Sequence, residues 1–325
     1  MITETTGAFV LMTLSTAPAR VNHDGQRAGI AASVVARFDP NCCFSHPQGE
    51  ERCVRNSLVA TRSVMGLLGL FKQEAAPAAR FLDGRVGYAV GDVHGRADLL
   101  AKMLNLLEQR AAADTRPDGP PIVVFLGDYV DRGPKSGAVL DLLVGERPSG
   151  FERRFLKGNH EQAMLAFLED PLANRGWIMH GGAETLRAYD VQPPPTVGGE
   201  DLVWLMAADQ LRVRLPEAHK DFLDRLERFA VLGDYVFVHA GVDQSRAVEE
   251  QLDQDLFWAR GRFLTERKRY SHRIVHGHTP VDEPYADQRR VAVDTGAYAS
   301  GTLTAARFEG EEVSFISVSG RDPQG

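Results

Sequence analysis

The chain of 325 residues has few cysteines, no excess of positive charge and no long apolar run. Its three cysteines, Cys42, Cys43 and Cys53, form no CxxC or His-Cys pattern, which excludes a cysteine-based zinc site. With 37 basic and 44 acidic residues, the net charge of -7 has the wrong sign for a protein that binds nucleic acid mainly by charge. No apolar run reaches the roughly 18 residues of a membrane-spanning helix. We therefore expect neither nucleic acid nor a membrane as a partner.

The rest of the composition is typical of a globular protein with a substantial core, since 43% of the residues are hydrophobic and 25% are charged. No cysteine follows Cys53, which fits a reducing compartment, and we expect a cytoplasmic location. Residues 1–64 differ from the remainder because they contain six Arg, no Lys and no regular periodicity. We interpret them as a disordered extension or an artefact of start-codon choice, and residues 65–325 as the functional domain.

From residue 84 onwards, short apolar segments of strand type end in a small residue and a polar residue able to bind metal. Helical patterns lie between them, clearest in residues 97–110, where Leu and Met recur at spacings of three and four. This alternation predicts an α/β protein whose site lies beyond the strand ends. Residues 162–230 interrupt this alternation of strands and helices, and we expect them to form a helical insertion over one side of the site. The strand-type segments are 87–95, 122–133, 153–161, 235–241, 273–280 and 290–297.

Six residues of ligand type follow five of these segments: Asp92, His94, Asp128, Asn159, His239 and His278. Asp92 and His94 stand two apart, so both side chains lie on one side of an extended segment. The carboxylate of Asp128 can bridge two ions that are roughly 3.5 to 4 Å apart. The amide oxygen of Asn159 suits a hard divalent ion that is already held by carboxylate and imidazole. Together these residues predict a two-metal centre.

The motifs GDVHG, GDYVDRG, GNHE, HAG and GHTP, in this order, resemble those of the phosphoprotein-phosphatase branch of the calcineurin-like metallophosphoesterases. That branch includes Ser/Thr protein phosphatases and symmetrical diadenosine tetraphosphatases. The resemblance covers about residues 65–318, and GDYVDRG is its most specific motif. It implies a four-layer α/β/β/α sandwich and two divalent metal ions, with Mn²⁺ expected and Fe or Zn as alternatives.

The resemblance also implies a role for each site residue. Asp92 and His94 would bind the first metal, Asp128 would bridge the two, and Asn159, His239 and His278 would bind the second. Arg132 of GDYVDRG and Arg260 of FWAR would bind phosphate oxygens. His160, oriented by Asp131, would protonate the leaving group.

Two further histidines compete with these residues. His180 lies among helical residues and follows no strand-like segment, so His239 is the better ligand. His276 lies two residues before His278. The family pattern makes His278 the ligand, so we expect His276 to lie behind the ligands without binding metal itself. The sequence alone does not define the roles of His180 and His276.

These features predict an enzyme that hydrolyses phosphomonoesters by direct attack of a metal-bound hydroxide. We rank a Ser/Thr phosphoprotein phosphatase first, with a phosphoprotein or a small phosphorylated molecule as substrate. Symmetrical hydrolysis of dinucleoside tetraphosphates is the alternative, and the acidic chain argues slightly against such a polyanionic substrate. A noncatalytic phosphate-binding relative is the weakest alternative, because every ligand position is filled. The insertion contributes Trp177, Trp204, Tyr189 and Arg187, whose aromatic rings either bind substrate or belong to the core.

Overall fold

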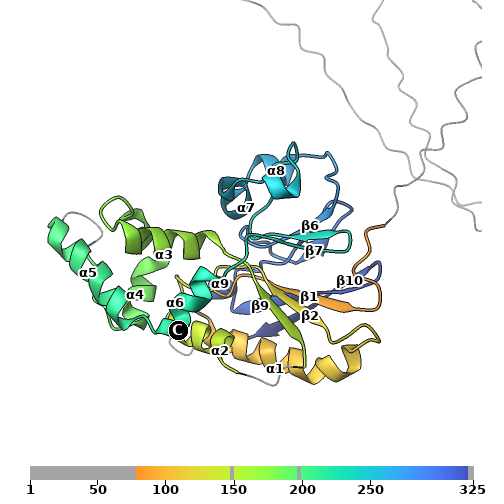
Figure 1. The fold of residues 1–325 in the computed structure, drawn as a ribbon, viewed down its shortest axis with the longest axis horizontal. Coiled ribbons are helices and arrows are strands. Elements are labelled where there is room, and N and C mark those ends of the chain that lie inside the picture. Colours follow the sequence, from red (N-terminus) through yellow and green to blue (C-terminus); the bar gives the residue numbers. More distant parts are fainter. Residues whose placement is uncertain (1–77, 147–149, 196–198, 321–325) are drawn as a thin grey trace, which may run out of the picture. The chain divides into compact units, whose positions relative to one another are not determined.

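The computed structural model describes residues 78–146, 150–195 and 199–320, all within the unit that spans Glu74–Gly325. Two five-stranded sheets lie face to face, and helices cover the outer face of each sheet (Figure 1). The expected four-layer α/β/β/α arrangement is therefore confirmed. The expected extension, residues 1–64, and the boundary at residue 65 lie outside the described residues.

The first sheet has the strand order β10-β9-β1-β2-β3. Its strands are β1 (Val86–Val90), β2 (Ile122–Phe125), β3 (Glu152–Phe155), β9 (Thr302–Glu309) and β10 (Glu312–Ser319). Strands β1, β2 and β3 run parallel, and β9 and β10 close the sheet as an antiparallel hairpin. The hairpin turns at Gly310, whose φ of 56° suits glycine.

The second sheet has the strand order β4-β5-β6-β8-β7. Its strands are β4 (Ala230–Leu232), β5 (Tyr235–Phe237), β6 (Arg273–His276), β7 (Tyr285–Ala286) and β8 (Arg290–Ala292). Strands β5, β6 and β8 run parallel. In both sheets, parallel strands therefore bring their carboxyl ends to one edge, where the candidate ligands follow.

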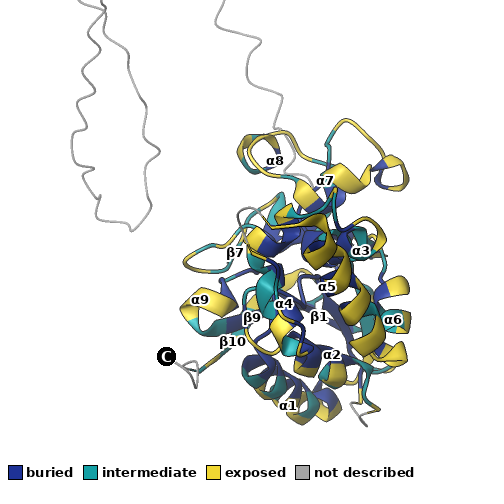
Figure 2. Ribbon diagram, turned by 90° about the vertical axis from the view of Figure 1, so that its left-hand side faces the viewer, coloured by how far each residue is buried: buried dark blue, intermediate teal, exposed yellow. Residues whose placement is uncertain are grey.

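Alternating side chains of the strands fill separate cores. In β1, Tyr88 belongs to the core under α1 (Ala97–Asp114) and α2 (Ser136–Val144), whereas Ala89 belongs to the core between the sheets. In β5, Phe237 packs between the sheets and Val236 packs under α7 (Asp253–Trp258) and α8 (Arg262–Thr265). Figure 2 shows the strands buried and the outer helix faces exposed. Burial on both faces explains the nearly continuous apolar strands of the sequence.

The predicted helix over residues 97–110 is confirmed by α1, whose apolar stripe is buried against the first sheet. That stripe consists of Leu99, Leu100, Met103, Leu104 and Leu107.

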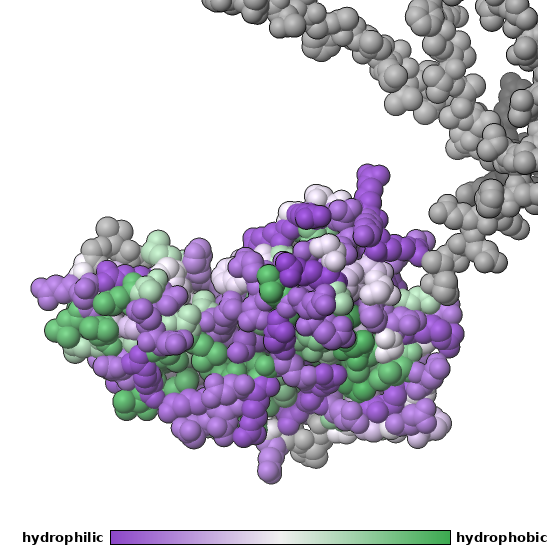
Figure 3. All heavy atoms as spheres, turned by 45° about the horizontal axis from the view of Figure 1, so that its top comes forward, coloured by the Kyte–Doolittle hydropathy of each residue, from purple (hydrophilic) through white to green (hydrophobic). Residues whose placement is uncertain are grey.

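Helices fill most of the chain between β3 and β4. They are α3 (Asn159–Glu169), a π-helical turn (Ile178–Gly182), α4 (Ala183–Ala188), α5 (Asp201–Arg214) and α6 (Glu217–Asp224). Trp177, Trp204 and Tyr189 are buried in the core, so the aromatic rings of this segment do not line a substrate groove. Helix α5 exposes Leu202, Leu205, Met206 and Val213. Figure 3 shows apolar side chains at the left end of the molecule, the end at which Figure 1 places α5.

Three short helical elements complete the described chain: a 3₁₀ turn (Val248–Glu250), α8 and α9 (Ala297–Ser300). None of the helices in the described ranges combines the length and the apolar character that a bilayer crossing demands.

Candidate metal centre

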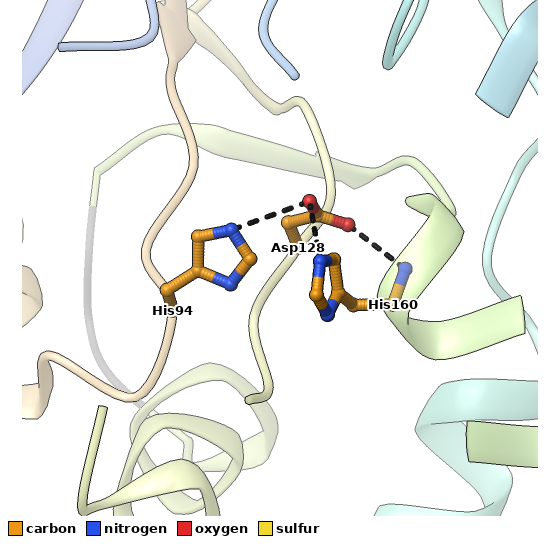
Figure 4. A group of neighbouring side chains, drawn as sticks. All are labelled: His94, Asp128 and His160. Carbon is orange, nitrogen blue, oxygen red and sulfur yellow. Dashed lines mark hydrogen bonds and ion pairs between the residues drawn. The ribbon is translucent and has the colours of Figure 1, made fainter. Parts of the chain in front are cut away.

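The six expected ligands all lie at the carboxyl ends of parallel strands and are all buried. Asp92 and His94 follow β1, Asp128 follows β2, Asn159 follows β3, His239 follows β5 and His278 follows β6. The structure brings two groups together, each with ligand atoms within 4.8 Å of one another. One group is His94, Asp128 and His160, shown in Figure 4, and the other is Asp128, His239 and His278.

Asp128 belongs to both groups. Its Oδ2 lies 3.4 Å from Nε2 of His94 and 3.4 Å from Nε2 of His239. The other carboxylate oxygen accepts a hydrogen bond from the backbone N–H of His160 at 3.1 Å (Figure 4). This position between two imidazoles is the one that a bridging carboxylate requires.

Two of the histidines are fixed in the tautomer that metal binding needs. Nδ1 of His94 lies 2.9 Å from the carbonyl oxygen of Val130, and Nδ1 of His239 lies 2.9 Å from that of Leu126. Because a carbonyl oxygen only accepts, each Nδ1 carries the proton and each Nε2 keeps its lone pair towards Asp128. Burial lowers the pKa of both rings, that of His94 to about 3, so both are neutral.

The second group suits a cation. Nε2 of His239 lies 2.9 Å from Oδ1 of Asn159, which places two hydrogen-bond acceptors side by side with no proton between them. Nδ1 of His278 lies 3.2 Å from the same nitrogen. Burial and the nearby His239 lower the pKa of His278 to about 3. Neutral imidazoles, an amide oxygen and a carboxylate form a donor set that fits a divalent ion.

Asp92 is connected to the second group through the backbone. Its carboxylate accepts a hydrogen bond from the N–H of His278 at 3.0 Å. This close approach depends on Gly277, because a Cβ there would lie 2.2 Å from Oδ1 of Asp92. Asp92 is in neither of the two compact groups.

Asp294 is a buried acid that the sequence analysis missed. It follows β8, and its carboxylate is close enough to Asp92 for the two groups to interact. Burial and the neighbouring negative charges raise the pKa of both carboxyls, that of Asp294 to about 6. A bound cation would offset this repulsion. The signal was present in the sequence, since the apolar part of segment 290–297 is followed by a polar residue able to bind metal, as in the other strand-type segments.

Glu161, the last residue of GNHE, was also missed as a site residue. Its buried carboxylate accepts the N–H groups of Asp128 at 2.9 Å, Tyr129 at 2.7 Å and Gly158 at 2.9 Å. These bonds connect the loop after β2 to the start of α3. Glu161 therefore positions the loop that carries Asp128.

Backbone strain is concentrated at the site. Five of the six non-glycine residues with positive φ in the described part of the chain are candidate site residues: His94, Asp128, Asp131, Arg132 and His278. Such conformations cost free energy and persist only where surrounding contacts enforce them. Their clustering is typical of a functional site.

His160 is held by a buried carboxylate. Its Nδ1 lies 2.7 Å from Oδ2 of Asp131, which leaves Nε2 on the side of Asp128, at 3.9 Å. Burial alone would lower the pKa of His160, but the charges of Asp128 and Asp131 outweigh it and raise the pKa. The raised pKa favours the protonated imidazole, which is the form able to donate a proton.

Asp131 is itself fixed by the helical segment. Oδ2 accepts a hydrogen bond from Nε1 of Trp177 at 2.7 Å, and Oδ1 accepts one from the hydroxyl of Thr185 at 2.6 Å. Trp177, which is 46 residues from Asp131 in sequence, therefore contributes to the orientation of His160. The other buried tryptophan of this segment, Trp204, has no partner for its Nε1 among the described residues.

This difference provides a matched test. Trp177→Phe should lower kcat for an alkyl phosphate by about 10- to 100-fold, the usual loss when a partner behind a functional group is removed. Trp204→Phe removes the same atoms from a side chain that is also 3% exposed, and it should leave kcat unchanged. Steady-state kinetics on both variants, with thermal melts to verify folding, measure the difference. Equal kcat values would show that Trp177 serves packing alone.

The two expected arginines lie beside different ligand groups. The guanidinium carbon of Arg132 lies 4.7 Å from the ring centroid of Tyr298, and this ring also packs edge-on against His94. Arg260 lies just beyond the end of α7, and its Nε donates to Nε2 of His278 at 2.9 Å. Both guanidinium groups therefore lie next to candidate ligands. Tyr298 supports Arg132 by a cation–π contact that the sequence analysis did not foresee.

The competing histidines lie outside both groups. His180 is exposed in the π-helical turn. His276 is buried, its Nδ1 contacts the carbonyl oxygen of Gly277, and its ring packs edge-on against Phe263. The geometry therefore supports the choice of His239 and His278.

A model of the calcineurin-like phosphoesterase family matches residues 88–308. The chain belongs to this family. The phosphoesterase resembles curated proteins named asymmetrical bis(5'-nucleosyl)-tetraphosphatase PrpE. That from Bacillus velezensis is 30% identical over 261 residues, covering 70% of this chain and 91% of the relative. That from Halalkalibacterium halodurans is 27% identical over 251 residues, covering 72% of this chain and 94% of the relative.

These relatives alter the substrate ranking made from the sequence. They favour the alternative, a dinucleoside tetraphosphatase, over the Ser/Thr protein phosphatase that we ranked first. Their names also specify asymmetrical cleavage, whereas the alternative given in the sequence analysis was the symmetrical reaction. The expectation of a metal-dependent phosphoesterase is confirmed.

Proposed function

We propose that this phosphoesterase hydrolyses dinucleoside tetraphosphates asymmetrically, to a nucleoside monophosphate and a nucleoside triphosphate. The observation that carries the proposal is the pair of buried ligand groups that share Asp128. The names of the PrpE relatives support the substrate class and the asymmetry.

In this proposal His94 and Asp92 would hold one divalent ion, Asn159, His239 and His278 would hold the other, and Asp128 would serve both. Bound divalent ions supply Lewis-acid chemistry, which activates water and neutralises phosphate oxygens. We expect Mn²⁺, with Fe or Zn as alternatives. The cytoplasmic location stays a prediction.

The arginines bind the phosphoryl group. Arg132 and Arg260 approach from the two ligand groups, and their planar guanidinium forks match phosphate oxygens. Local cations of this kind outweigh the net negative charge of the whole chain, because a charged substrate responds to the field at the site.

His160 donates a proton to the leaving oxygen. Its Nδ1 is held by Asp131 while Nε2 remains on the side of the centre. In an anhydride, the leaving group is a phosphate, which is a weaker base than an alkoxide and needs this proton less. The same residues therefore serve esters and anhydrides, with a smaller contribution from His160 to anhydrides.

The proposal predicts a substrate preference. Protein loaded with Mn²⁺ should hydrolyse diadenosine tetraphosphate with a higher kcat/KM than a phosphoserine peptide. Both substrates should be assayed with the same preparation of the protein. Chelator-treated protein is the control and should lose both activities. A higher kcat/KM for the phosphopeptide would instead support the protein-phosphatase alternative.

A further inference from the structure

The π-helical turn before α4 contains a kink at two adjacent glycines. Its backbone leaves the helical conformation at His180, with φ of -101° and ψ of 16°, and at Gly181, with φ of 110° and ψ of 0°. A residue with a Cβ rarely adopts a φ of 110°, so the kink depends on glycine. The kinked chain lies against the loop after β2, which carries Asp131 and Arg132.

Gly181 contacts the backbone of Arg132. Its carbonyl oxygen accepts a hydrogen bond from the N–H of Arg132 at 3.2 Å. A Cβ at position 181 would lie 2.6 Å from this nitrogen and 2.8 Å from Cγ of Arg132, closer than real Cβ atoms approach. Arg132 itself has a φ of 65°, a conformation that persists only where surrounding contacts enforce it. Gly181 therefore helps to hold Arg132 in this conformation.

The side chain of Arg132 is held at its other end as well. Its Nη2 lies 3.2 Å from Nε2 of His160, and its guanidinium carbon lies 4.7 Å from the ring centroid of Tyr298. A guanidinium fork binds two phosphate oxygens only when its plane has the correct orientation. A shift of the backbone of Arg132 would therefore move the fork away from this orientation.

Gly182 contacts a different part of the site, the indole ring of Trp177. A Cβ at position 182 would lie 2.5 Å from both Cδ2 and Cε2 of this ring. Cε2 is bonded to Nε1, which donates to Asp131 at 2.7 Å. The indole is rigid and only 3% exposed, so it cannot turn away from an added methyl group. Because Gly182 has an ordinary helical φ of -65°, it is space that requires glycine here, and not backbone conformation.

We propose that the two glycines are positioning residues with separate functions. Gly181 sets the orientation of Arg132 and thereby the binding of phosphate. Gly182 sets the place of the Trp177 indole and thereby the orientation of Asp131 and the proton donor His160. The inference rests on the proposed function, because that function assigns phosphate binding to Arg132 and proton donation to His160.

Gly181→Ala should weaken phosphate binding. The assay follows p-nitrophenyl phosphate hydrolysis by the Mn²⁺-loaded full chain, with inorganic phosphate as a competitive inhibitor. The inhibition constant of phosphate should rise about 10-fold, the loss expected for one hydrogen bond to a charged group. Arg132→Ala calibrates the assay and should raise the constant at least as much. An unchanged constant in either variant overturns the assignment of Gly181.

Gly182→Ala should instead impair proton donation. Its kcat for an alkyl phosphate should fall by about 10- to 100-fold, as expected when a partner behind a functional group is displaced. Its kcat for p-nitrophenyl phosphate should fall much less, because that leaving group departs without a proton, and the inhibition constant of phosphate should not change. This variant needs no strained φ, so it decides the proposal if Gly181→Ala does not fold. Equal losses of kcat on the two substrates overturn it.

Two other glycines provide controls. Gly310→Ala introduces a side chain at a φ of 56°, and Gly176→Ala introduces one in the same segment as the turn. Neither added Cβ would meet an atom within 4 Å among the described residues. Gly310→Ala should lower the melting temperature, and both variants should keep the wild-type kinetics. If Gly181→Ala and Gly182→Ala instead showed the same pattern of losses, the turn would serve stability alone and the proposal would fall.

Failure of the proposed function would have a different signature, because none of these assays contains a dinucleotide. In that case the wild-type protein would not hydrolyse diadenosine tetraphosphate, yet the separate effects of Gly181→Ala and Gly182→Ala would persist. Tetraphosphate hydrolysis at the wild-type rate in both variants, with unchanged phosphate inhibition, would keep the function and overturn the role of the glycines.

Discussion

Replacement of Asp128 by asparagine is expected to lower kcat/KM by more than about 100-fold, above the 10- to 100-fold typical of residues that only support a ligand. The physical reason is that Oδ2 of Asp128 lies 3.4 Å from the ring nitrogens of both His94 and His239. The substitution removes a negative charge that both ligand groups share. Asparagine keeps a side-chain oxygen that can accept the hydrogen bond from the N–H of His160, so the loop after β2 can keep its conformation.

Metal content and kinetics should be measured together on this variant. We expect less than two equivalents of bound metal after dialysis, as well as the kinetic loss. Asp114→Asn is a matched control, because Asp114 is also a buried acid but pairs with Tyr88 and Arg307 away from the centre. It should lower thermal stability and leave the metal content unchanged. A near-normal rate and full metal content in Asp128→Asn would show that Asp128 does not bridge.

His160→Ala should produce a loss of rate that depends on the leaving group. General acids contribute about 100- to 10,000-fold, so kcat on an alkyl phosphate should fall by that amount. The loss on p-nitrophenyl phosphate should be much smaller, since its leaving group departs without a proton, and the loss on diadenosine tetraphosphate should lie between the two. The structure supports this role through the 2.7 Å contact between His160 and Asp131.

A second buried histidine provides the control for this experiment. His219 contacts the hydroxyl of Tyr189 at 2.9 Å and the carboxylate of Asp141 at 3.0 Å, so it is also buried and paired with an acid. His219→Ala should lower thermal stability, and any loss of rate should be equal for the three substrates. Equal losses on all three substrates in His160→Ala would mean that His160 binds metal or serves structure instead.

The parts of the site that could be predicted from sequence are those encoded locally. Asp92, Asp128 and His239 each follow a short apolar segment directly, and a parallel sheet necessarily brings such positions to one edge. The helical stripe of α1 was predictable for the same reason, since its periodicity lies within one segment.

The contacts that hold the site were not predictable because their partners are distant in sequence. Trp177 reaches Asp131 across 46 residues, and Glu161 reaches the N–H of Asp128 across 33. No periodicity specifies such pairs. The substrate ranking weighed the net charge of the whole chain, whereas a substrate responds to the local charges of Arg132 and Arg260, and the PrpE relatives favour the alternative.

Asymmetrical hydrolysis of dinucleoside tetraphosphates is tested most directly by the identity of the products. Diadenosine tetraphosphate should be incubated with the Mn²⁺-loaded protein, and the products separated by chromatography at early times. We predict equal amounts of AMP and ATP, and no products from metal-free protein. ADP as the sole product, or an intact substrate under conditions in which a phosphoserine peptide is hydrolysed, would contradict the account.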